Sequence, residues 1–448
     1  MERKAPGTPL DRWIAGKVHG GRGAPSFVSR EDLDRYHLER LREAVDYARD
    51  RSPYYARRLN GFSGGGLDSF ADVAALPFTT ERDIKDSPLS FLCVSQDEIA
   101  RVVTLNTSGT TGPSKRLFFT AGDLELTIDF FHHGMSTLVS PGQRVLILLP
   151  GEKRDSVGDL LKRGLARMNV EGVVHGPVRD VDRALSDIVK FDIDCLVGIP
   201  TQVLWMVRHG GRGIPAGRIG SVLLSTDYVP KAIVDEIGRV WGCPVFSHYG
   251  TTETGLGFAV ECAALSGHHI READFYVEIV DPVTGLSCPD GQEGEIVFTT
   301  LTRKGMPLVR YRTGDISRFM IEPCPCGTAL KRLGRVSGRF EGRVPVGRNH
   351  VLTIPDLDEA LFPVPGLINY SVELVRDDDK DRLVLHLYTG KADDGDLANT
   401  AHKAAMTVPA VREAVMEGSL EVPQPNFTST NPFTTGVGKR RLVVRTTA

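Results

Sequence analysis

The chain has 448 residues, which predicts two or three domains, because single hydrophobic cores stop growing at roughly 250–300 residues. Of these residues, 41% are apolar and 25% are charged, and the formal net charge is -3. This composition is typical of a soluble enzyme and excludes a global positive field that would attract nucleic acid or a membrane. Without a signal-like apolar segment, a membrane-length apolar run or a disulfide-scaffold spacing among its seven cysteines, the sequence predicts a cytoplasmic protein.

The first half of the chain predicts an α/β domain. An amphipathic helix is expected within residues 28–60, and from residue 121 predicted helices alternate with apolar strands. The helices lie near 123–135, 156–168, 180–190, 201–209 and 231–241, and the strands near 144–149, 170–174, 194–199, 221–224 and 245–248. This alternation indicates βαβ units and a mainly parallel sheet.

The second half predicts a change of architecture. Short strands separated by turn residues, near 275–280, 294–300 and 315–319, indicate a β-rich subdomain at about 270–335. Beyond residue 342, helices near 355–361 and 396–409 and strands near 371–376 and 383–388 indicate a small α+β unit. We therefore expect an α/β fold with a large N-terminal domain, residues 1–340, and a small mobile C-terminal domain, residues 343–448.

Residues 107–115 combine hydroxyls, glycines and a lysine in one short segment. Glycines let backbone N–H groups approach a ligand, and hydroxyls with a cation suit a phosphate chain. The order of residues does not fit a Walker A loop, and a flexible polar linker is the alternative. The candidate phosphate-binding residues are Ser108, Gly109, Thr110, Thr111, Gly112 and Lys115.

Two further motifs predict a nucleotide site. Tyr249 and Glu253 follow an apolar strand, at the end of a parallel sheet where ligands bind. Tyr249 offers a ring for stacking and Glu253 an oxygen ligand for Mg²⁺. Asp315, beside a glycine, could accept the two hydroxyls of a ribose. An ordinary turn with a surface glutamate and an Asx-turn are the alternatives.

In this order and at these separations, the three motifs resemble the adenylate-forming superfamily of acyl-CoA synthetases and ligases. The stretches 261–282 and 294–312 are similar to the branch of phenylacetate-CoA ligases and coenzyme F₃₉₀ (deazaflavin) synthetases. The resemblance covers about residues 75–445. It implies ATP, Mg²⁺ and CoA as cofactors and a two-step reaction through an acyl-AMP. Two departures concern the loop, which ends Pro113-Ser114-Lys115, and the hinge, where Glu341-Gly342 replaces the usual aspartates.

The resemblance also implies roles for individual residues. Lys439 matches the catalytic lysine, Thr110 lies in the phosphate loop and Glu253 matches the Mg²⁺ ligand. The residues that it places around the nucleotide, besides the loop, are Ser225, Thr226, Asp227, Tyr249, Gly250, Thr252, Asp315 and Arg339. Read from the residues alone, Lys439 belongs to a basic segment that could simply be solvated.

Four residues form a candidate structural zinc site. Cys324 and Cys326 make a Cys-x-Cys knuckle, and Cys262 with His269 would complete a tetrahedral Cys₃His set. Cys288 and His268 are the competing ligands, and buried packing of the cysteines is the alternative.

The sequence identifies the acid and the acyl acceptor less closely than the nucleotide site. Phe131, His132 and His133 lie on a predicted helix that the resemblance places at the acid pocket, and they favour an aryl acid with a polar substituent. Core packing with a surface histidine is the alternative. The expected partners are a small carboxylic acid and CoA, with no nucleic acid and no membrane, and a homodimer is open. The alternatives are a carrier-protein thiol as acceptor, a deazaflavin hydroxyl as the adenylated group, and a non-catalytic nucleotide-binding paralogue.

Overall fold

The computed structural model describes residues 7–20, 25, 27–105, 114–377, 380–390, 395–428, 431 and 440–446. The chain divides into two compact units, which are described separately. Unit 1 comprises residues 1–141, 153–169 and 248–336, and unit 2 comprises residues 142–152, 170–247 and 337–448. In the described part of the chain, no helix is both long enough and apolar enough to cross a membrane.

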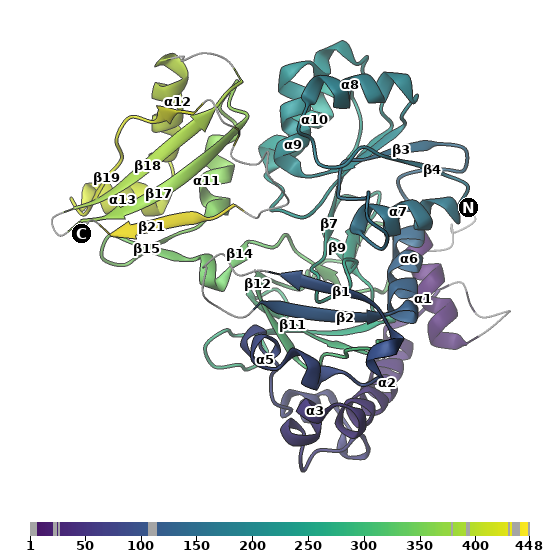
Figure 1. Ribbon diagram of the computed structural model, residues 1–448. Helices are drawn as coiled ribbons and strands as arrows, with labels where there is room; N and C mark the ends of the chain where they lie inside the picture. Colours follow the sequence, from purple (N-terminus) through teal and green to yellow (C-terminus); the bar gives the residue numbers. More distant parts are fainter. Residues whose placement is uncertain are drawn as a thin grey trace. The chain divides into compact units, whose positions relative to one another are not determined.

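Unit 1 begins with helices and continues into antiparallel strands (Figure 1). Its helices are α1 (Pro9–His19), α2 (Arg30–Arg51), α3 (Pro53–Arg58), α4 (Phe70–Ala74), α5 (Glu81–Asp86), α6 (Ala121–Met135) and α7 (Val157–Ala166). Local sequence fixes the helix starts: in α2, the Ser29 hydroxyl accepts the N–H of Asp32, whose carboxylate accepts back from Ser29.

Three antiparallel arrangements make up the strands of unit 1. Strands β1 (Ile99–Leu105) and β2 (Lys115–Thr120) pair with each other, and β10 (Phe275–Val280), β11 (Gly294–Thr300) and β12 (Tyr311–Ser317) form a sheet in that order. Strands β8 (Ala259–Glu261), β9 (His268–Ile270) and β13 (Arg332–Leu333) form the third. The predicted β-rich region is therefore present, although β12 begins four residues before the expected strand. The β1–β2 pair was not expected from the sequence.

Unit 2 contains the predicted parallel strands. They are β3 (Arg144–Ile147), β4 (Glu171–Val174), β5 (Cys195–Gly198), β6 (Ser221–Leu224) and the start of β7 (Val245–Tyr249), in the order β7-β6-β5-β3-β4. The connecting helices are α8 (Val181–Lys190), α9 (Pro200–His209) and α10 (Lys231–Trp241). Strands β3, β5 and β6 are almost wholly buried, as expected for a parallel sheet.

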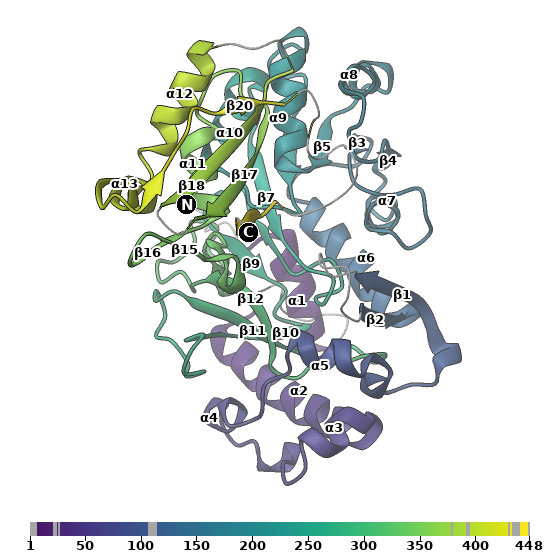
Figure 2. The ribbon, with the colours of Figure 1, turned by 60° about the vertical axis from the view of Figure 1, so that its left-hand side comes forward.

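The C-terminal part of unit 2 is the expected α+β structure (Figure 2). Its elements are β14 (Gly338–Arg339), β15 (Val344–Val346), β16 (His350–Leu352), α11 (Ile354–Leu361), β17 (Asn369–Arg376), β18 (Asp381–Tyr388), α12 (Gly395–Ala405), α13 (Pro409–Met416), β19 (Leu420–Glu421), β20 (Asn426–Phe427) and β21 (Leu442–Thr446). One helix was expected near 396–409, but a second begins at Pro409, because proline is well tolerated in a first helical turn.

One hydrophobic core joins the parallel strands of unit 2 to its C-terminal elements. Residues of α9 and α10, such as Met206 and Ile237, belong to the same buried cluster as Leu361 of α11 and Leu385 of β18. The chain passes from unit 1 to unit 2 between residues 336 and 337, close to the expected boundary near residue 340, but residues 337–448 group with 142–152 and 170–247. Rotation of the C-terminal residues as a separate body stays a prediction.

Candidate active site

Part of the predicted machinery lies outside the described residues. It comprises Lys439 and five residues of the predicted phosphate loop, Ser108, Gly109, Thr110, Thr111 and Gly112. The loop's remaining member, Lys115, is described, and so is Arg440, which follows Lys439. These two cations therefore mark where the described structure meets the predicted catalytic segments.

Lys115, the first residue of β2, is a buried cation held between two carboxylates. Its ammonium makes an ion pair with Glu253 and lies 3.1 Å from Oε2 of Glu81 on α5. The side chains of Lys115 and Glu253 are only 8% and 7% exposed. The structure thus joins two residues predicted separately for phosphate and Mg²⁺ binding, and it adds Glu81, which no sequence motif indicated.

The charge of Glu253 is set by this pairing. Burial by itself would raise the pKa of Glu253, but the charge and hydrogen bond of Lys115 outweigh it and lower the pKa to about 2. The Tyr311 hydroxyl also donates to Oε1 of Glu253, at 3.4 Å. Glu253 is therefore an ionised carboxylate at neutral pH, which is the form that a hard cation such as Mg²⁺ requires.

Tyr249 and Asp315, two of the residues expected around the nucleotide, are in direct contact in unit 1. The Tyr249 hydroxyl donates to Oδ2 of Asp315 at 2.7 Å, across a separation of 66 residues. Asp315 is 2% exposed. At Gly250 a side chain is excluded, because a Cβ would lie 2.8 Å from the Leu256 carbonyl oxygen. The loop then turns, with the Thr252 carbonyl accepting the N–H of Gly255 at 3.0 Å.

The remaining predicted nucleotide residues belong to unit 2. Ser225, Thr226 and Asp227 follow β6 directly. Thr226 has a φ of 76°, a strained value for a β-branched residue, and its buried hydroxyl has no hydrogen-bond partner in the described chain. Asp227 makes an ion pair with Arg440, and Arg339 lies exposed in β14. Strain of this kind is common at ligand-binding segments, and the role of these residues around the nucleotide stays a prediction.

The predicted zinc ligands come together in unit 1. The Sγ atoms of Cys262 and Cys324 are 3.6 Å apart, and Nε2 of His269 lies 3.5 Å from Sγ of Cys324 and 3.7 Å from Sγ of Cys326. All four ligand atoms lie within 4.8 Å of one another, which fits a tetrahedral ion. The competing Cys288 lies elsewhere, its thiol 3.8 Å from the Glu293 carbonyl.

The residues expected at the acid pocket pack in two different ways. The ring of Phe131 lies 6.4 Å from that of His248 and is buried, so it is part of the core. His132 and His133 stack with their ring centroids 4.2 Å apart, and His133 also stacks on Trp13 of α1 at 5.3 Å. Burial lowers the pKa of His133 to about 4, so this ring is neutral at pH 7. Contact of the three residues with an acid stays a prediction.

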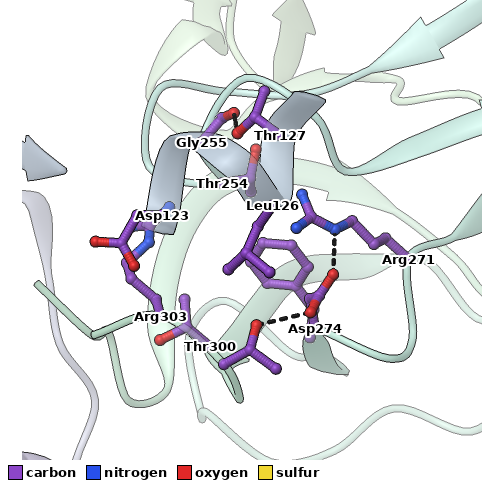
Figure 3. Close-up of a pocket in the computed structure, with 11 residues that line it drawn as sticks. Asp123, Leu126, Thr127, Thr254, Gly255, Arg271, Asp274, Thr300 and Arg303 are labelled. Carbon is purple, nitrogen blue, oxygen red and sulfur yellow. Dashed lines mark hydrogen bonds and ion pairs between the residues drawn. The ribbon is translucent and has the colours of Figure 1, made fainter. Parts of the chain in front are cut away.

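A separate pocket in unit 1 has a strongly charged lining (Figure 3). Its empty space is about 240 Å³, including its opening to solvent. Arg271 bonds to Oδ2 of Asp274 at 2.5 Å, whereas Nη1 of Arg303 is buried and has no hydrogen-bond partner among the described residues. The lining residues are Asp123, Leu126, Thr127, Thr254, Gly255, Arg271, Asp274, Phe275, Thr300, Thr302 and Arg303. No sequence motif indicated this pocket.

Comparisons with known proteins support the predicted family. The family model of AMP-binding enzymes matches residues 93–301. The chain is 29% identical to the phenylacetate-coenzyme A ligase of Thermus thermophilus, over 78% of this chain and 79% of that protein. It is also 29% identical to the phenylacetate-coenzyme A ligase of Pseudomonas putida, over 80% and 82% of the two chains.

A solved structure extends the similarity to the fold. The crystal structure of a 2-hydroxyisobutyryl-CoA ligase, in the postadenylation state, matches with a TM-score of 0.79 and 19% identity. The match covers 93% of this chain and 90% of that chain. At this identity the comparison supports the shared architecture and carries no conclusion about the acid.

Proposed function

Because this chain belongs to the adenylate-forming superfamily, on the phenylacetate-CoA ligase-like branch, we propose that it activates an aryl carboxylic acid with ATP and transfers the acyl group to CoA. The observation that carries the proposal is the pairing of predicted nucleotide residues across long sequence separations. Tyr249 is bonded to Asp315, and Lys115 to Glu253, within one compact unit.

The first half-reaction joins two anions. A carboxylate oxygen of the acid attacks the α-phosphorus of ATP, and the bond to the leaving pyrophosphate breaks. Charge repulsion is the obstacle, so cations and fixed positions supply most of the help. Lys115 is already dehydrated and held by two carboxylates, so it can offer its charge to a phosphate oxygen without much reorganisation. We assign this role to Lys115. To Lys439 we assign the stabilisation of the negative charge that develops in the transition state.

Glu253 is the residue that would hold Mg²⁺, which when bound neutralises phosphate charge. In this structure the Glu253 carboxylate makes an ion pair with the ammonium of Lys115. Glu253 would hold the metal, and Lys115 would supply a further positive charge to the phosphates. The Asp315 carboxylate accepts a hydrogen bond from the Tyr249 hydroxyl, and we assign to this carboxylate the binding of the ribose hydroxyls.

The second half-reaction needs a thiol. The CoA sulfur attacks the acyl carbonyl, the thioester forms and AMP leaves. The aryl acid is the finer part of the proposal, supported by the names of the two bacterial relatives and by the aromatic residues Phe131, His132 and His133. A structural zinc ion at the Cys₃His cluster is a further part, supported by the ligand distances.

The test is a pyrophosphate-release screen across aryl and fatty acids, with and without CoA. We expect release that depends on an aryl acid and formation of its CoA thioester. A preference for long-chain fatty acids would contradict the aryl part only. If pyrophosphate is released and the thioester forms on a carrier protein but not on CoA, the acyl acceptor is a carrier protein and not CoA. Absence of release with every acid would overturn the proposed activity.

A further inference from the structure

Arg440 occupies a buried site made for a guanidinium. Its two terminal nitrogens bond to the two oxygens of Asp358, with Nη2 lying 2.6 Å from Oδ2, and its Nε lies 3.2 Å from Oδ2 of Asp227. The side chain of Arg440 is 3% exposed, and that of Asp358 is wholly buried. This fork-to-carboxylate geometry is specific to arginine, because a lysine has a single charged nitrogen.

Aromatic rings and a further hydrogen bond complete the site. The guanidinium carbon lies 5.1 Å from the ring centroid of Phe362 and 5.6 Å from that of Tyr370. The Tyr370 hydroxyl donates to Oδ1 of Asp358 at 2.6 Å. The guanidinium is therefore held by two carboxylates and by two neighbouring aromatic rings, whose centroids are 5.7 Å apart.

Stability alone does not account for such a cluster. Taking three charged groups out of water is expensive, and a well-packed apolar group of similar volume often serves stability as well or better. A buried ion cluster does hold its members in a definite geometry, because any displacement leaves a charge unpaired. The arrangement at Arg440 is thus better suited to positioning than to strengthening the fold.

The place of Arg440 in the chain identifies what it positions. Lys439 precedes it directly, and consecutive Cα atoms are about 3.8 Å apart. Two residues after Arg440, the chain enters β21, where Leu442 pairs with Val372 of β17. Arg440 is therefore the first described anchor after Lys439, and the ladder of β21 continues from it.

The partners of Arg440 come from two parts of unit 2. Asp358 is on α11, whereas Asp227 lies after β6 in the segment expected beside the adenine. Other bonds join the same two parts: the Tyr228 hydroxyl donates to Glu359 at 2.7 Å, and Arg208 donates to the Phe362 carbonyl at 2.7 Å. Arg440 thus connects the C-terminal end of the chain to a predicted nucleotide-binding segment.

We propose that Arg440 is a positioning residue that holds Lys439 in register for adenylation, by binding Asp358 and Asp227 at once. The inference rests on the proposed function for the role of Lys439, and on contacts within unit 2 for the anchor. A displacement of a reacting group by about 1 Å can lower a rate by about 100-fold. Loss of the anchor is therefore expected to affect the adenylation step and to spare the attack of CoA on a preformed acyl-AMP.

The experiment compares Arg440→Met and Arg440→Lys with Arg441→Met, a matched control at the exposed neighbouring position. ATP–pyrophosphate exchange measures adenylation, and thioester formation from synthetic acyl-AMP measures the second step. For Arg440→Met we expect kcat for exchange to fall by about 100-fold with little change in the KM for ATP. Arg440→Lys should recover part of the loss, and Arg441→Met should behave as wild type. Equal losses in both half-reactions, or no loss, would overturn the proposal.

A second measurement judges the anchor without using activity. Hydrogen exchange of the peptide that covers residues 440–446 should become about 10-fold faster in Arg440→Met and stay unchanged in Arg441→Met, because the anchor limits local opening. If Arg440→Met does not fold, Asp227→Asn, which keeps Asp358 in place, should show the same pattern more weakly. Unchanged hydrogen exchange would overturn the anchor. A wild-type protein without acid-dependent pyrophosphate exchange would instead overturn the proposed function, and with it the catalytic role of the anchor.

Discussion

Each unit of the molecule contains a buried cation between two carboxylates. In unit 1, Lys115 lies between Glu253 and Glu81, and in unit 2, Arg440 lies between Asp358 and Asp227. Each cation also adjoins a segment that the sequence predicts to be catalytic. The surroundings differ, however, since Glu81 is 40% exposed and Asp227 only 16%.

This difference teaches how one kind of ion cluster can serve two purposes. Lysine is a point charge on a flexible chain, so Lys115 can leave Glu253 for a phosphate when another cation takes its place. Arginine binds a carboxylate through a rigid fork, and Arg440 is in addition held by two rings. We therefore propose that the cation of unit 1 is exchangeable and that the cation of unit 2 is fixed.

The largest effect is expected at Lys439, next to the fixed cation. Lys439→Ala should lower the rate of ATP–pyrophosphate exchange by a factor that corresponds to about 2–4 kcal/mol, because a charge-stabilising group is lost. Thioester formation from synthetic acyl-AMP should be much less affected. If both half-reactions fell equally, Lys439 would not have the assigned role.

The exchangeable cation can be tested through the pH dependence of stability. The pKa of Glu253 is lowered from 4.5 to about 2, so Glu253 contributes stability that is present above pH 4.5 and lost as the pH falls through 2. Lys115→Met removes the main cause of this shift. The free energy of unfolding should therefore fall by about 3 kcal/mol at neutral pH, and the difference from wild type should shrink below pH 4.5.

A matched control for this variant is Lys85→Met. Lys85 also pairs with Glu81, at 2.5 Å, but it does not contact Glu253. Urea unfolding of the two variants between neutral and acidic pH gives the comparison. A Lys85→Met variant that lost as much stability as Lys115→Met, or a Lys115→Met effect independent of pH, would show that the Glu253 pair is not the cause.

The sequence predicted some residues of these two ion clusters, but not which of them pair. The parallel strands and the Tyr249 and Asp315 motifs were predictable, because hydrophobic periodicity and motif order are local signals. The pairing of Arg440 was not, since Asp227 and Asp358 lie 213 and 82 residues away in the sequence and no local signal links either of them to Arg440. Arg440 itself belongs to a basic segment, and such a segment is usually expected to be exposed to solvent. Glu81 and Arg303 were not predicted for the same reason, because burial and pairing arise only in the folded chain.

A smaller effect, on thermal stability, is expected at the cysteine–histidine cluster. It tests whether unit 1 also needs a metal for its stability. The protein purified without chelator should hold about one zinc per chain, and Cys326→Ser should lose it and melt several degrees lower. Cys288→Ser, outside the cluster, is the control. Elemental analysis that finds no zinc in the wild type would end the idea.

The smallest effect is expected at His133, because stacking on Trp13 already holds its ring. His133→Ala should reduce the preference for a polar-substituted aryl acid over phenylacetate by about threefold to tenfold in kcat/KM, and leave the affinity for ATP unchanged. The exposed His209→Ala serves as control. If the ratio of kcat/KM for the two acids is unchanged in both His133→Ala and His132→Ala, this helix does not determine the preference for the acid.

The central claim, activation of a carboxylate as its acyl-AMP, is tested most directly by following the oxygen atoms. An aryl acid labelled with a heavy oxygen isotope in its carboxylate is incubated with the protein, ATP, Mg²⁺ and CoA, and the products are analysed by mass spectrometry. Attack of the carboxylate on the α-phosphorus leaves one labelled oxygen in AMP when the thiol displaces it, so we expect labelled AMP, unlabelled pyrophosphate and the aryl-CoA thioester. Label in inorganic phosphate with formation of ADP, or unlabelled AMP, would contradict the account.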